Sequence, residues 1–144
     1  MQSGEGVVTW LGNTDYSLAR SSKDYREANK FLKDREVEYT GLSFPTIIAR
    51  REKDVIGVIS TVKDEPRITA GPLHVDVGKG SQELFTTIKL TSCYDGILKK
   101  AGITKYWIWM RVGAKLIEVC ERLSCYERVE MNDDDSFVWF ERSL

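Results

Sequence analysis

His74 and Asp76 are the titratable residues whose spacing first suggests chemistry. They alternate with aliphatic residues in the stretch Leu73-His74-Val75-Asp76-Val77, a pattern that predicts a β-strand. Alternate side chains of a strand point to opposite faces, so the aliphatic residues would face the core and His74 and Asp76 the open side. Because imidazole titrates near neutral pH, His74 is the better candidate for a general base. A hydrogen-bonded surface pair without chemistry is the alternative interpretation.

A polar turn with the sequence GKGSQE, residues 78–83, follows this strand and precedes a helical pattern from Leu84 to Ala101. The N–H groups of a helix N-terminus are unpaired and the helix dipole is positive there, so the turn is suited to phosphate or another anion. A second strand, Tyr106 to Met110, follows the helix, and the three elements form a βαβ unit with parallel strands. This second strand is apolar on both faces, which predicts that it is covered on both sides.

Composition limits the class of protein. The chain has 144 residues, 42% hydrophobic and 30% charged, which predicts one globular domain over residues 1–144 with a loose tail at residues 1–6. The net charge of −1 argues against a dedicated nucleic-acid binder or a binder of anionic membranes. No apolar run approaches the ~20 residues of a membrane-spanning helix.

The N-terminus and the cysteines indicate a cytoplasmic protein. Residues 1–6 carry neither a basic region nor an apolar core of a secretion signal. The three cysteines are an odd number, which fits reduced thiols in a reducing compartment. With one histidine and no Cys-x-x-Cys pair, the sequence predicts no zinc site.

The remaining elements predict a mixed, mostly antiparallel sheet with helices on both faces, an α/β or α+β domain. Ser21 or Ser22 would cap a helix whose first turn contains Asp24. The pattern predicts a strand at 7–11, a helix from 22 to about 33 or 37, a hairpin of 46–50 with 55–62, a kink or bulge at Gly71-Pro72, a helix at 114–123 and a closing hairpin of 128–131 with 137–140.

From Thr46 to the C-terminus this order resembles the GNAT superfamily of N-acetyltransferases, as a divergent member similar to small acetyltransferase-like proteins of bacteriophages. The segment from Ile47 to Ile59 resembles the central hairpin of that family. The segment from Ala114 to Met131, with Cys-Glu-Arg-Leu at 120–123, resembles its second cofactor-side helix and the strand after it. The resemblance implies that the strand at 73–77 and the strand at 106–110 splay apart and hold acetyl-CoA between them.

The resemblance also implies site residues and an activity, the direct transfer of an acetyl group to a small-molecule or protein amine. The Gln/Arg-x-x-Gly-x-Gly/Ala motif of the family matches at Gln82, and a second frame uses the glycines of the preceding turn. Cys120 stands where the family commonly has a proton-donating tyrosine, and Tyr126 is the nearest phenol. The catalytic candidates are therefore His74, Asp76 and Tyr126, and the cofactor-binding candidates are Val75, Val77, Gly78, Lys79, Gly80, Ser81 and Gln82.

Three interpretations remain open. The turn glycines, Lys79 and the pair of His74 and Asp76 favour the enzyme. Phe85 and Thr87, at positions where the motif has small residues, favour an inactive protein of the same fold that acts as a binding or virion-associated structural protein. A sheet without a splay would instead indicate another α/β fold that binds a different phosphate ligand. Trp139 and Phe140 near the C-terminus predict either core packing or a homodimer contact.

Overall fold

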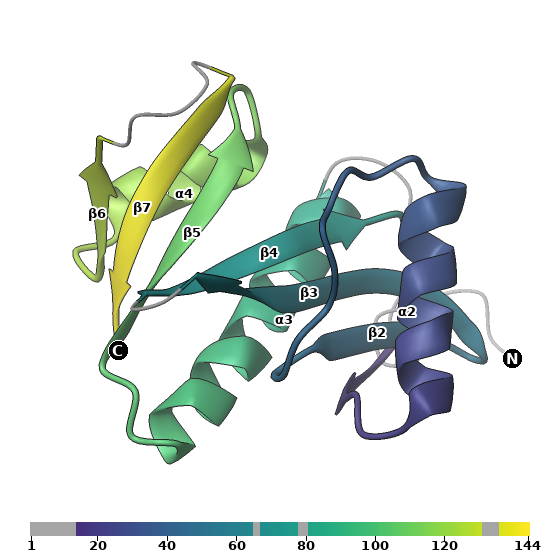
Figure 1. Cartoon of the computed structure of the whole chain (residues 1–144). Coiled ribbons are helices and arrows are strands. Elements are labelled where there is room, and N and C mark those ends of the chain that lie inside the picture. The colour runs from purple at the N-terminus through teal and green to yellow at the C-terminus, as the bar shows by residue number, and fades with distance from the viewer. Residues whose placement is uncertain (1–13, 65–66, 78–80, 131–135) are drawn as a thin grey trace, which may run out of the picture.

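The computed structural model of the chain describes residues 14–64, 67–77, 81–130 and 136–144 (Figure 1). In chain order its elements are β1 (Thr14–Leu18), α2 (Ser22–Asp34), β2 (Ile47–Arg51), β3 (Asp54–Asp64), β4 (Arg67–Val75), α3 (Ser81–Lys100), β5 (Lys105–Arg111), α4 (Lys115–Arg122), β6 (Tyr126–Val129) and β7 (Phe137–Ser143). No helix in these ranges has both the length and the apolar composition needed to cross a membrane.

A seven-stranded sheet with the order β1-β2-β3-β4-β5-β7-β6 organises the domain. Neighbouring strands are antiparallel except β4 and β5, which are parallel and are joined through α3. Helix α2 covers one face, and α3 and α4 cover the other (Figure 1). The mixed, mostly antiparallel sheet with helices on both faces and the βαβ unit are therefore confirmed.

Helix α2 begins where its sequence predicts. The hydroxyl of Ser21 accepts a hydrogen bond from the Asp24 N–H at 3.1 Å, and the Asp24 carboxylate accepts one from the Ser21 N–H at 3.3 Å. This reciprocal capping box satisfies donors that the first helical turn leaves unpaired. The apolar face of the helix packs on β2 and β3 in a cluster of buried residues that comprises Ala19, Ala28, Phe31, Leu32, Ile48 and Val58.

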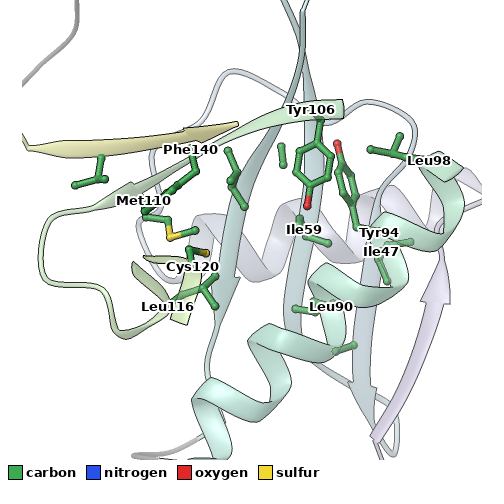
Figure 2. Close-up of a cluster of buried hydrophobic side chains, with 14 of the residues drawn as sticks. Ile47, Ile59, Leu90, Tyr94, Leu98, Tyr106, Met110, Leu116, Cys120 and Phe140 are labelled. Atoms are coloured by element: carbon green, nitrogen blue, oxygen red, sulfur yellow. The ribbon is translucent and has the colours of Figure 1, made fainter. Parts of the chain in front are cut away.

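Helices α3 and α4 enclose the larger core against the opposite face of the sheet. Figure 2 shows Leu90, Tyr94 and Leu98 on α3 and Leu116 and Cys120 on α4 among the buried side chains of that face. Gly57 of β3 lets α3 approach closely, because a Cβ there would lie 3.0 Å from Cδ1 of Leu90 and 3.2 Å from Cγ2 of Val75.

A buried polar network ties α3 to the C-terminal strands. The Tyr106 hydroxyl donates to the Asp95 carboxylate at 2.6 Å, and the Arg142 guanidinium donates to its other oxygen at 2.8 Å. The Tyr94 and Thr61 hydroxyls share a hydrogen bond of 2.8 Å in the same core. Each polar group thus has a partner that offsets its loss of hydration.

Several predicted boundaries differ from the structure. The strand predicted at 7–11 lies outside the described residues, and β1 lies at Thr14–Leu18, a mostly polar edge segment with weak alternation. Strand β4 spans Arg67–Val75 instead of beginning at Leu73, because Thr69 and Ala70 are buried and already pair with β5. The prediction that β5 is covered on both faces is wrong: Tyr106, Ile108 and Met110 are buried, whereas Trp107 and Trp109 are half-buried.

Candidate functional site

Strands β4 and β5 part soon after they meet. Within the described strands they pair only at Thr69 with Trp107 and at Ala70 with Ile108, and they diverge beyond that point (Figure 1). The cause lies in Gly71 and Pro72. The Trp109 ring lies so close to Gly71 that its Cζ2 atom is 3.0 Å from where a Cβ would be, and Pro72 has no N–H for the ladder. The splayed pair is thus present as expected, and the β3–β4 register also shifts here, between Ile59 and Thr61.

A cavity of about 480 Å³ lies at the end of the parted strands. Its walls come from the segment after α2, the end of β4, the first turns of α3, the end of β5, the start of α4 and the start of β7. They are formed by residues 35–38, 72–75, 83, 84, 87, 109–111, 114–116 and 137. The strands that border the cavity separate α2 on one face from α3 and α4 on the other (Figure 1). Residues after α2 and residues of α3 and α4 all line the cavity, so its walls come from both faces.

His74 lies in the cavity wall on the face of the sheet that α2 covers. It pairs with Val58, and its ring centroid is 5.9 Å from that of Phe31 in α2. Its neighbours Leu73 and Val75 pack against the opposite core. Burial lowers the pKa of His74 below its ordinary value, so the imidazole is neutral at pH 7 and able to accept a proton.

Asp76 lies just beyond β4 and pairs with Arg35, the residue that follows α2. Arg35 donates from Nε to its carboxylate at 2.6 Å, and the Asp76 side chain is 53% exposed. Asp76 is not among the residues that form the cavity wall. The structure therefore places Asp76 beside the site, where its charge acts on His74 together with that of Arg35.

Tyr126 lies away from His74, in the core on the α4 side. Its ring packs edge-on against Phe140 with a centroid distance of 6.2 Å, and the Arg142 guanidinium lies 5.0 Å above it. Burial raises the pKa of its phenol well above the ordinary range. Cys120 is also buried there, and burial raises the pKa of its thiol to about 12. Neither residue lines the cavity.

The cofactor-binding candidates are distributed around the start of α3. Val75 lines the cavity and Val77 packs against the larger core. Ser81 is the first residue of α3, and Gln82 is exposed in its first turn. Gly78, Lys79 and Gly80 lie outside the described residues.

Most residues of the cavity wall were not indicated by the sequence. Trp109 and Phe137 pack edge-to-face with a centroid distance of 5.2 Å, and the Arg111 guanidinium lies 5.5 Å from the Phe137 ring. Trp109 was expected in the core because its strand is apolar throughout. Arg35 belongs to a segment whose approach to β4 depends on the tertiary fold, so local sequence gave no signal for it. Glu83 lies in the turn predicted to bind an anion, and its carboxylate in the wall runs against that prediction.

The chain is similar in structure to solved acetyltransferases. No model of a known protein family matches it, and no curated protein matches it in sequence. Ard1 from Thermoplasma volcanium superposes with a TM-score of 0.68 at 12% identity, covering 92% of this chain and 98% of that one. Naa50 from Arabidopsis thaliana, in complex with the bisubstrate analogue CoA-Ac-MVNAL, gives 0.65 at 13% identity, covering 92% and 99%. An acetyltransferase of the GNAT family from Staphylococcus aureus gives 0.63 at 11% identity, covering 90% and 98%.

Proposed function

Because the chain has the fold of the GNAT acetyltransferases, we propose that it transfers an acetyl group from acetyl-CoA to an amine by direct attack. The observation that carries this proposal is the cavity of about 480 Å³ at the divergence of β4 and β5. Its volume lies in the range of small-molecule sites, roughly 300–1,000 Å³. The similar structures, one of them bound to a CoA bisubstrate analogue, support the same choice of ligand.

The residues of the wall fit a thioester-bearing ligand. Leu84, Met110 and Leu116 provide an apolar surface for an acyl chain and its thiol arm. The backbone of β4 from Pro72 to Val75 has no partner on β5, so its edge is available to hydrogen-bond an extended amide chain. The unpaired N–H groups in the first turn of α3 suit the phosphates.

The chain's own residues would promote attack by the amine. Acetyl-CoA supplies an acetyl thioester, whose C–S bond breaks as the acceptor's C–N bond forms. His74, neutral at pH 7, would take the proton that the attacking nitrogen must lose. Backbone N–H groups at the free edge of β4, near Val75, would stabilise the developing oxyanion. The departing thiolate would leave with CoA and gain its proton from solvent.

The acceptor would approach from the face that α2 covers, on the side of His74. Glu36 and Glu38 line that side, and their carboxylates favour a cationic acceptor such as the amine of a small molecule or a peptide. Trp109 and Phe137 add an aromatic surface to the same cavity wall.

A second candidate function, ligand binding without catalysis, is favoured by the first turns of α3. Glu83 places a carboxylate in the cavity wall near the expected phosphate position, and Phe85 is 43% exposed where the family motif has a small residue. A carboxylate there would repel phosphate.

Calorimetric titration with acetyl-CoA and CoA tests both functions. Micromolar binding, tightened by Glu83→Gln about two- to fivefold through loss of like-charge repulsion, would support the cofactor cleft. Glu118→Gln on the exposed side of α4 is the matched control, because Glu118 does not line the cavity. Absence of heat and of a thermal shift at millimolar acetyl-CoA would reject the enzyme. Absence of CoA binding, which repulsion of its phosphates by Glu83 would produce, would favour the second function. Binding without transfer to any amine in a panel of amino acids, peptides and polyamines would contradict the proposed transfer.

A further inference from the structure

Arg35 connects the end of α2 to the end of β4. It is the C-cap residue of α2, and its Nη1 donates to the Phe31 carbonyl oxygen at 3.2 Å. Its Nε donates to the Asp76 carboxylate at 2.6 Å, and its guanidinium carbon lies 4.0 Å from the centroid of the Phe31 ring. Two hydrogen bonds and a ring contact therefore hold the guanidinium, which fixes its position more firmly than a lone surface ion pair would.

Phe31 places this cation beside His74. The Phe31 ring is buried, 4% exposed, and contacts both the Arg35 guanidinium and the His74 imidazole. Arg35 and His74 also share the cavity wall. The guanidinium of Arg35 therefore lies near the His74 imidazole, and its contacts with Phe31 limit its movement.

Charged groups from three elements act on the imidazole. Arg35 from α2 disfavours the imidazolium and adds to the effect of burial, which is the largest cause of the lowered pKa of His74. Asp76 from the end of β4 and Glu83 from α3 act in the opposite direction. The effect of Asp76 on the pKa of His74 is larger than that of Arg35, so Arg35 reduces, without cancelling, the rise that Asp76 alone would cause.

We propose that Arg35 is a positioning residue for His74: anchored by Asp76 and Phe31, it sets the wall of the cavity beside the imidazole and opposes the protonation of the imidazole that the carboxylates of Asp76 and Glu83 favour. The catalytic meaning of this role rests on the proposed acetyl transfer. The electrostatic relationship between the two side chains does not, and it is measurable without any substrate.

The chain has a single histidine, so the imidazole resonances in an NMR pH titration belong to His74 alone. In the full-length protein, Arg35→Gln should raise the titration midpoint by about half a pH unit, since a fixed neighbouring cation is removed. Arg35→Lys keeps the charge, and its midpoint should stay closer to that of the parent protein. Lys33→Gln, an exposed change in the last turn of the same helix, is the matched control and should leave the midpoint unchanged.

An unchanged or lowered midpoint in Arg35→Gln, with the backbone amide spectrum otherwise retained, would overturn the proposal. If Arg35→Gln does not fold, Arg35→Met replaces it, because methionine keeps apolar packing on the Phe31 ring and removes the charge. Its midpoint should rise in the same way, and an unchanged midpoint in that variant would equally overturn the proposal. If acetyl transfer is found, the acid limb of the pH profile should move with the midpoint, and an unmoved limb would contradict the role in catalysis. Failure of every amine to react would reject the proposed function and leave the titration result standing.

Discussion

The indole ring of Trp109 lies against the α-carbon of Gly71, at the point where β4 leaves β5. Its Cζ2 atom is 3.0 Å from the position that a Cβ on Gly71 would occupy, and the Cε2 and Nε1 atoms are at 3.1 Å. A side chain at this position would have to displace a ring that belongs to the cavity wall.

Gly71→Ala should therefore destabilise the protein by about 1–3 kcal/mol, through overpacking against Trp109 and through a φ of 156° that residues with a side chain rarely adopt, and should weaken ligand binding in the cavity. Urea denaturation and calorimetry would measure the two effects. Gly96→Ala is the control: nothing lies within 4 Å of a Cβ there, and a helical Gly→Ala change should stabilise by about 0.5–1 kcal/mol. Equal effects of the two substitutions would contradict the close approach of Trp109.

Gly57 and Leu90 should show coupled effects. Gly57→Ala alone places a methyl group 3.0 Å from Cδ1 of Leu90 and should cost about 1–3 kcal/mol. Leu90→Ala alone removes a fully buried side chain and should cost about 2–5 kcal/mol. In the double variant the new methyl group occupies the vacated space, so the cost should be about 1 kcal/mol less than the sum. Strict additivity in a double-mutant cycle would show that the two residues do not meet.

Breaking the buried ion pair of Asp95 and Arg142 should reduce the stability of the protein far more than breaking an exposed ion pair. Their side chains are 12% and 14% exposed, and the carboxylate also accepts from Tyr106. Arg142→Met leaves a buried carboxylate without its cation and should cost about 3–5 kcal/mol. Arg128→Met breaks the exposed pair with Glu121 and should cost at most about 1 kcal/mol. Chemical denaturation of both variants measures the two losses in the free energy of unfolding. Similar losses would mean that burial does not determine how much an ion pair contributes to stability.

Glu36 occupies a backbone conformation that favours glycine. Its φ is 56°, and the C-terminus of α2 closes with hydrogen bonds from Glu36 N to the Lys33 oxygen at 3.0 Å and from Val37 N to the Leu32 oxygen at 3.0 Å. In this helix-ending motif glycine is the usual residue. Glu36→Gly should raise the free energy of unfolding by up to about 1 kcal/mol. Glu38→Gly, in the same segment without a positive φ, should not stabilise, and thermal denaturation would distinguish the two.

Local signals in the sequence predicted most of the architecture. Ser21 and Asp24 mark the start of α2 because a capping box needs only neighbouring residues, and the charged turn at 51–54 marks the hairpin of β2 and β3 in the same way. Strand β1 escaped prediction because an edge strand need not bury alternate residues, and its segment is mostly polar.

The candidate site was less predictable because its wall assembles residues distant in sequence. Strand alternation indicated His74, the family resemblance implied Val75, and both lie in the wall. Arg35, Glu36 and Trp109 were not found, because their positions depend on how α2 and β5 meet the end of β4. Tyr126 was chosen as the nearest phenol in sequence, but β6 pairs only with β7, at the far edge of the sheet, and the strand turns the ring into the core.

The short seam between β4 and β5 divides the sheet into two blocks that share little backbone pairing. Strands β1 to β4 hold one block and β5 to β7 the other, and only the pairs Thr69–Trp107 and Ala70–Ile108 join them within the described strands. A ligand in the cavity touches both blocks, so its binding energy adds directly to the cohesion of the domain. Ligand binding in the cavity would thus hold the two blocks together. It would slow amide hydrogen exchange at the paired residues of β4 and β5 more than in the outer strands of either block.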